Sequence, residues 1–240
     1  MADDAEDARL AQLIETVLAG RARVSVDDTI AIATRLNQTI DDGTVERAAV
    51  GVRQGLPVVC SRGCNGCCEE PVMVWMPEAQ VVARWLMDPA QLAVRTRFLA
   101  AFPAWQKAAG DGPRRLAELG GRVSHDEYLA EHQAQWGRRV MCAFNHQGDC
   151  TIYPVRPPAC RNGHAVGTSA RCSGASYGGR PASRLEFTPL DEFIARADAV
   201  LHAMHVAAGG DRRRAMALCE AVHRLLQSAM AAERKAQRRR

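Results

Sequence analysis

The sequence predicts a mainly α-helical protein, an irregular helical domain with little or no sheet. Three observations lead to this prediction. Apolar residues recur at helical spacing, as Leu10, Leu13, Ile14, Val17 and Leu18 do near the start of the 240-residue chain. Residues that favour helix starts precede several such stretches. The two passages that break the helical pattern are rich in cysteine, glycine and proline. We therefore expect helices that hold together two cysteine-rich loops.

Composition is that of a globular protein, with 47% hydrophobic residues and a formal net charge of +4. The acidic start lacks the basic and apolar regions of a secretory signal, and no segment approaches the roughly 18 apolar residues of a membrane span. We expect a cytoplasmic protein without membrane contact. Thiols stay reduced in that compartment, so nine clustered cysteines favour metal or redox chemistry over structural disulfides.

The strongest local charge is the basic C-terminal end, RKAQRRR. Such a run is typical of the solvated end of a helix, and contact with a polyanion is the alternative. Aromatic residues make up only 5% of the chain, and none are interleaved with this tail as platforms for base stacking. The pattern therefore argues against nucleic-acid binding, and no feature identifies a protein partner.

The chain divides into three parts, which we expect to form one compact domain. These are N-terminal helices in 1–55, a cysteine-cluster region in 56–175, and a C-terminal helical hairpin with a basic tail in 176–240. In the first part, Asp27 or Asp28 is expected to cap the second helix, and Gly20 and Gly43 are expected to break the helices.

The first cysteine-rich loop, CSRGCNGCCEEP, holds four cysteines within nine residues: Cys60, Cys64, Cys67 and Cys68. The spacing of Cys64 and Cys67 suits two thiolates on one metal, because Gly63 and Gly66 permit the tight turn between them. Adjacent cysteines do not easily face one ion. Cys67 and Cys68 therefore serve two metals, or one of them packs while the other binds.

Helical segments are predicted between the two loops, after a short extended stretch. Pro77 suits a first helical turn, and Asp88 with Pro89 can start the next helix. Further along, Ser124 and Glu127 have the spacing of a capping box, in which each side chain bonds the other residue's backbone amide.

The second cysteine-rich loop carries Cys142, Cys150 and Cys160, about 75 residues after the first. Its prolines and glycines exclude a continuous helix, and one short strand is expected at 150–153. We expect the two loops to close one metal site, so that metal binding contributes directly to folding.

The C-terminal part starts with 165–189, a stretch rich in Gly, Ser and Arg that we expect to be irregular and that contains Cys172. Two helices follow, predicted at 190–206 and 212–236. Cys219 falls on the apolar face of the last helix, so it is predicted to be a core residue and not a ligand.

The candidate metal ligands are all in the loops: Cys60, Cys64, Cys67, Cys68, Cys142, Cys150, Cys160 and Cys172. His146 or His164 could complete the set, whereas His202 and His205 are read as the polar edge of a packed helix. Two other readings stay open. Free cysteines are often small core residues, and C-x2-C is also the spacing of a redox dithiol.

Together, CSRGCNGCC and CAFNHQGDCTIYPVRPPACR resemble the bacterial YkgJ-type CxxCxxCC cysteine-cluster family, whose members are described as zinc- or iron-chelating domains. The second motif is the more specific, and these residues match it in order: Cys142, Cys150, Ile152, Tyr153, Arg156, Pro157, Cys160 and Arg161. The resemblance covers residues 60–172. It departs in the first interval, which is x3 here, with Ser61 at the place of a family cysteine. The resemblance implies metal binding, and a related group includes flagellin lysine N-methylases.

Three functions follow as hypotheses. The first is a metal-binding protein with a structural or redox role, holding an iron–sulfur cluster or zinc on soft thiolates, with Arg62, Arg156 and Arg161 either near the sulfurs or bonded to loop carbonyls. The second is a metal-dependent enzyme such as a protein lysine N-methylase-like transferase, although no glycine-rich nucleotide turn is present. The third is a module that reports metal or redox state to a partner.

Overall fold

The fold is known from a computed structural model, which describes residues 2–21, 23–60, 63–162, 165 and 188–238. Most of the regular structure in these residues is helical, and the strands form only two two-stranded sheets, so the prediction of a mainly α-helical protein is confirmed. The helices are α1 Ala2–Leu18, α2 Val26–Arg53, α3 Met76–Met87, α4 Leu92–Ala109, α5 Gly112–Leu119, α6 His125–Gly137, α7 Pro158–Asn162, α8 Thr188–Ala207 and α9 Leu218–Gln237. The strands are β1 Met73–Val74, β2 Asn145–His146, β3 Asp149–Cys150 and β4 Met216–Ala217, and 3₁₀ turns occupy Gly66–Glu69, Pro89–Gln91 and Tyr153–Val155.

The N-terminal helices differ from the prediction in two details. Ser25 caps α2, because its hydroxyl accepts a hydrogen bond from the Asp28 amide at 3.0 Å, so Asp28 belongs to the first turn. The predicted break at Gly43 is wrong, since α2 continues through it. A Cβ at Gly43 would lie 2.8 Å from Leu190 Cδ1, so this glycine permits close packing of α8 on α2. Gly20, with φ +68°, follows the end of α1 as predicted.

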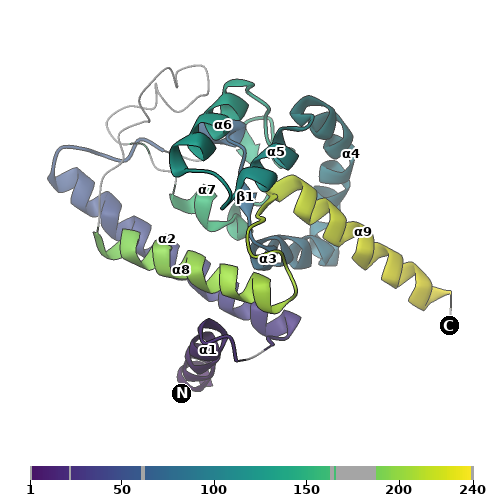
Figure 1. Ribbon diagram of the computed structural model, residues 1–240, viewed down its shortest axis with the longest axis horizontal. Coiled ribbons are helices and arrows are strands. Elements are labelled where there is room, and N and C mark those ends of the chain that lie inside the picture. Colours follow the sequence, from purple (N-terminus) through teal and green to yellow (C-terminus); the bar gives the residue numbers. More distant parts are fainter. Residues whose placement is uncertain (1, 22, 61–62, 163–164, 166–187, 239–240) are drawn as a thin grey trace.

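Helix α3 lies between two apolar cores, and α2 and α8 run side by side next to it (Figure 1). The helix-side core joins α1, α2 and α8 with one face of α3 and includes Leu10, Val17, Ile32, Leu36, Val81, Val200, Leu201 and Met204. The loop-side core joins α3, α4 and α9 with the second cysteine loop and includes Val74, Val82, Leu86, Phe98, Phe102, Phe144, Ile152, Val222 and Leu226.

The start signals between the two loops are confirmed. Pro77 lies in the first turn of α3, and the Asp88 carboxylate accepts a hydrogen bond from the Ala90 amide at 2.8 Å just before α4. Ser124 and Glu127 form the predicted capping box at α6.

Two predicted boundaries are wrong. The last helix begins at Leu218 instead of residue 212, because Met216 and Ala217 form β4, which pairs antiparallel with β1. The strand predicted at 150–153 is displaced: β3 is confined to Asp149–Cys150, where it pairs with β2, and Pro154 lies in the 3₁₀ turn that follows. Most of the stretch predicted as irregular at 165–189 lies outside the described residues.

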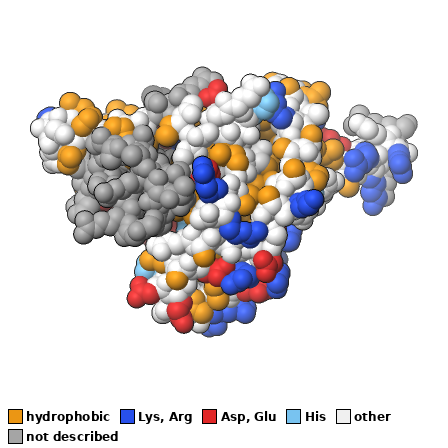
Figure 2. All heavy atoms as spheres, turned by 90° about the horizontal axis from the view of Figure 1, so that it is seen from above, with side chains coloured by type: hydrophobic (Ala, Val, Ile, Leu, Met, Phe, Trp, Pro, Cys, Tyr) orange, Lys and Arg blue, Asp and Glu red, His pale blue; other side chains and the backbone are white. Residues whose placement is uncertain are grey.

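The end of α9 projects from the body of the protein and carries basic side chains (Figure 2). Arg234, Lys235 and Arg238 are all exposed there, which fits the solvated end of a helix. In the part of the chain that the structure describes, no helix has both the length and the apolar character needed to cross a bilayer.

Candidate metal centre

Both cysteine loops line one cavity of about 110 Å³, which we call the thiol cavity. Seven cysteines contribute to its wall: Cys60, Cys64, Cys67, Cys68, Cys142, Cys150 and Cys160. The rest of the wall is largely apolar and includes Val72, Phe144, Ile152 and Leu218. Two segments far apart in the sequence thus present their thiols to the same space.

The first loop is folded by its own backbone bonds. Gly63 has φ +87°, a left-handed angle that glycine adopts without strain. The Cys68 amide then donates to the Asn65 carbonyl at 2.9 Å, which closes the 3₁₀ turn Gly66–Glu69. We expected the whole first loop to be irregular, and the 3₁₀ turn Gly66–Glu69 corrects this for four of its residues. It presents Cys67 and Cys68 to the same cavity.

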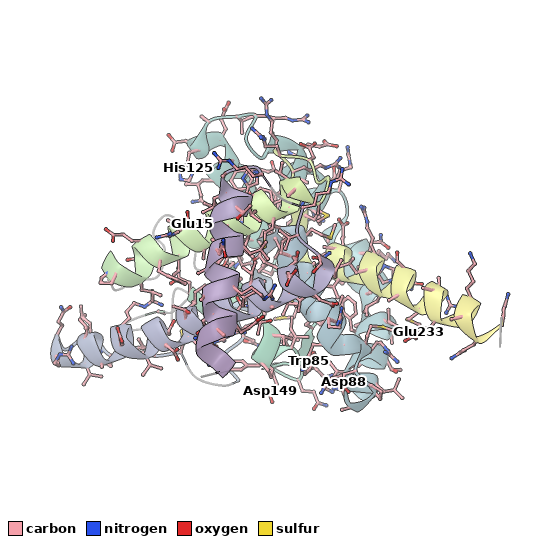
Figure 3. The ribbon with its side chains drawn as sticks, turned by 90° about the horizontal axis from the view of Figure 1, so that it is seen from below. Glu15, Trp85, Asp88, His125, Asp149 and Glu233 are labelled. Atoms are coloured by element: carbon pink, nitrogen blue, oxygen red, sulfur yellow. The ribbon has the colours of Figure 1, made fainter. Side chains whose placement is uncertain are left out.

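The second loop is built on the β2–β3 hairpin and the short helix α7. At the hairpin turn, Gln147 and Gly148 both have positive φ angles, and the Gly148 amide donates to the Asn145 side chain at 3.2 Å. Figure 3 labels Asp149, which marks the position of this hairpin. The hairpin places Cys150 at the cavity, and α7 places Cys160 there.

Direct hydrogen bonds join the loops to each other and to the following chain. The Cys142 amide donates to the Cys68 carbonyl at 2.8 Å, which ties the second loop to the first. The Ala165 amide donates to Cys60 Sγ at 3.2 Å, while the Ala165 carbonyl accepts from the Val59 amide at 3.0 Å. These bonds hold the two loops and Ala165 next to one another.

Most of the cavity thiols favour the protonated form. Burial raises the pKa of Cys150 to about 11 and also raises the pKa of Cys160. Cys68 differs from Cys150 and Cys160, because a hydrogen bond from the Cys67 thiol lowers the pKa of Cys68 to about 7 and raises the pKa of Cys67 in turn. A ligand that needs thiolates must therefore displace protons from this cavity.

Arg156 and Arg161, the two arginines of the second cysteine loop, have different roles. Arg161 is buried and bonds the chain around it, because its guanidinium donates to the Arg156 and Pro154 carbonyls and pairs with Asp41 of α2. Arg156 lines the thiol cavity and stacks over the Tyr153 ring at 3.9 Å. Among the described residues its buried Nε has no hydrogen-bond partner. We expected each arginine either to lie near the sulfurs or to bond loop carbonyls. Arg161 bonds carbonyls, whereas Arg156 lies near the cavity sulfurs. Arg62 lies outside the described residues.

Of the remaining candidates, only His146 lies among the described residues. His146 is exposed on the hairpin and is not part of the cavity wall, whereas Cys172 and His164 lie outside the described residues. His202 and His205 pack against the Trp75 ring, with ring centres 4.6 and 5.3 Å away.

Cys219 is buried in the loop-side core, as predicted. The sequence did not indicate that its Sγ lies 3.8 Å from Cys142 Sγ. No local pattern could have indicated this, because the two residues are 77 positions apart.

The donor types fit a soft metal, since thiolates are preferred ligands of zinc and of iron–sulfur clusters. The geometry is not that of a finished binding site. Within the described residues, no three His, Cys, Asp or Glu side chains converge closely enough to hold a metal ion. None of the eight described cysteines forms a disulfide.

Comparisons with models of known families, with curated proteins and with solved structures each give no match. The resemblance to the YkgJ-type family therefore stays a prediction that rests on the cysteine motifs alone.

Proposed function

We propose that this protein is a cysteine-ligated metal-binding protein that holds an iron–sulfur cluster or zinc in the thiol cavity. One observation carries the proposal: seven cysteines from two distant loops line a single cavity. Isolated core cysteines have no reason to gather in this way, whereas metal ligands must. The chain offers more thiols than one structural zinc requires, which favours a cluster or more than one ion.

The bound group, the cysteines and Arg156 would have separate roles in this cavity. The bound group would supply either a rigid cross-link between the loops or an electron-transfer centre. Cys67, Cys68, Cys150 and Cys160 would give up their protons on binding, and Arg156 would offset part of the negative charge that the thiolates bring. Because burial raises the pKa of Cys150 and Cys160, metal affinity should rise with pH.

We further propose that the protein works in the cytoplasm, because reduced thiols are the form that binds metal. The transferase alternative gains no support from the described residues, whose sheets are two antiparallel pairs and not a nucleotide-binding parallel sheet. The sensing alternative would require a partner, and no described surface identifies one.

The test is elemental analysis with an absorption spectrum on protein purified without oxygen. Stoichiometric iron and sulfide with charge-transfer absorption would identify a cluster, and colourless protein with zinc would identify a structural site. Protein that contains no metal, and that takes up neither zinc nor iron with sulfide when reconstituted, would refute the proposal.

Point variants separate ligands from packing. Cys64→Ser and Cys160→Ser should each lower the metal content, because both sulfurs line the thiol cavity. Cys219→Ser is the matched control, since Cys219 packs in the core outside that cavity and should leave the metal content of reduced protein unchanged. Equal losses in all three variants would contradict this division.

A further inference from the structure

The sulfurs of half-buried Cys142 and buried Cys219, which come from distant parts of the chain, lie close together. Cys142 Sγ, from the second cysteine loop, is 3.8 Å from Cys219 Sγ, in the first turn of α9. A disulfide bond is about 2 Å long. The sulfurs must therefore approach each other by less than one atomic diameter to form that bond.

The pair lies in the wall of a second cavity. This cavity, of about 50 Å³, is lined by both Cys142 and Cys219 and by mostly apolar neighbours such as Val72, Trp105 and Leu218. Cys142 also lines the thiol cavity, whereas Cys219 does not. Cys142 is thus the sulfur shared by the two cavities. The second cavity has room for a few water-sized molecules, so it can admit a small uncharged oxidant but not a peptide thiol.

We propose that Cys142 and Cys219 form a dithiol modification site that a small peroxide converts to a disulfide. In the first step, the sulfur of one thiol attacks a peroxide oxygen, the O–O bond breaks, the thiol proton passes to the leaving oxygen, and a sulfenic acid and water (or an alcohol) form. In the second step, the other thiol attacks the sulfenic sulfur, the S–S bond forms, and water leaves. The two thiols lose two electrons and two protons, and the peroxide is reduced.

The disulfide has a consequence for the thiol cavity, which rests on the function proposed above. Once Cys142 is bonded to Cys219, it cannot ligate a metal, since a disulfide sulfur carries no thiolate charge. The cavity then retains six of its seven described cysteines. Oxidation at the second cavity would thereby weaken binding at the first, and reduction would restore it.

The test uses reduced, metal-free full-length protein. Hydrogen peroxide is added, remaining thiols are alkylated, and an unreduced tryptic digest is examined by mass spectrometry. The expected product links peptide 215–224, which carries Cys219, to peptide 140–161. The second peptide carries Cys142, Cys150 and Cys160, so fragmentation must place the link at Cys142. Oxidised glutathione, which is too large for the cavity, should not produce the link.

Cys219→Ser is the matched variant, because it removes one sulfur and keeps the size of the side chain. It should lose the link and keep its zinc uptake after peroxide treatment, whereas the oxidised wild type should take up less zinc than the reduced wild type. One result would overturn the inference. Peroxide would form disulfides between other cysteines, such as Cys67 and Cys68, while Cys219 stayed reduced and was fully alkylated. Failure of the proposed function looks different: reduced protein would take up no metal, whether or not the link forms.

Discussion

The two cores of this protein are built in different ways. The helix-side core takes its side chains from α1, α2, α8 and α3, whose backbone amides are bonded within their own helices. The loop-side core takes its side chains from α3, α4 and α9 and from the second cysteine loop, which has little regular structure, and the thiol cavity lies beside it. Helix α3 serves both, since Val81 packs on one side and Val82 on the other. The loop-side core therefore depends on how the second loop is held against its helices, whereas the helix-side core is built by helices alone.

The strongest cross-links between the two regions run from α2 to α7. Arg47 of α2 is almost fully buried and donates to the Asn162 side chain at 2.8 Å. Asp41 of α2 pairs with Arg161. Cys160 directly precedes Arg161 and Asn162 on α7, so the regular region of the molecule fixes one wall of the thiol cavity.

The largest effect is expected from Arg161→Met, which removes this connection while keeping the length of the side chain. Two loop carbonyls, of Pro154 and Arg156, lose a charged donor in a buried setting. We expect the free energy of unfolding to fall by about 3 kcal/mol, measured by urea denaturation. The metal content should fall as well, because the described hydrogen bonds then hold α7 to α2 only through Arg47 and Asn162.

The control is Arg114→Met. Arg114 also pairs with a carboxylate, that of Glu118 at 3.0 Å, but both side chains are exposed. Such pairs contribute about 0.5 kcal/mol or less. Equal effects of the two substitutions would show that the loops do not depend on Arg161.

A second prediction concerns Glu78 of α3, at the junction of the two cores. Burial raises the pKa of Glu78 to about 8, although its carboxylate accepts a hydrogen bond from the Trp75 amide at 2.6 Å. In the unfolded chain the same carboxyl ionises near its ordinary value of 4.5. Between these values the folded state binds a proton that the unfolded state has lost, so stability should fall as pH rises through this window.

The measurement is urea denaturation of wild type and Glu78→Gln across the window. The amide keeps an acceptor for Trp75 but does not titrate. Between about pH 5.5 and about pH 7 the wild type should lose roughly 2 kcal/mol relative to the variant. Burial lowers the pKa of the neighbouring His205, which gives the opposite slope, but His205 is present in both proteins and cancels in the difference. Parallel curves would mean that Glu78 is ionised in the folded protein.

The sequence also predicted the structure of the helices better than the contacts between distant residues. Helical spacing and start signals identified α1 to α4 and α6, because these depend on residues close in the chain. Three features depend on contacts between distant residues, and no local pattern indicated them: the β1–β4 pairing, the uninterrupted course of α2 through Gly43, and the approach of Cys219 to Cys142. The cysteine motifs predicted the two loops whose cysteines line the thiol cavity. That these cysteines bind a metal stays a prediction.

The smallest effect is expected at Gly43, and it tests whether α8 packs on α2 as closely as the helix-side core requires. Alanine is favoured over glycine within a helix by about 1 kcal/mol. At Gly43 the added methyl group would meet Leu190 Cδ1 at 2.8 Å, so Leu190 must move and the gain is lost to overpacking. Gly137 of α6 is the matched control, because a Cβ there has no neighbour within 4 Å.

We expect Gly137→Ala to raise the free energy of unfolding slightly and Gly43→Ala to lower it by about 1 kcal/mol, both read from urea midpoints at constant slope. Since the two substitutions add the same atoms to the same kind of element, their difference isolates the α2–α8 contact. If Gly43→Ala stabilised the protein as much as the control, α8 would have to lie farther from α2. The helix-side core would then be packed less closely between α2 and α8 than the structure shows.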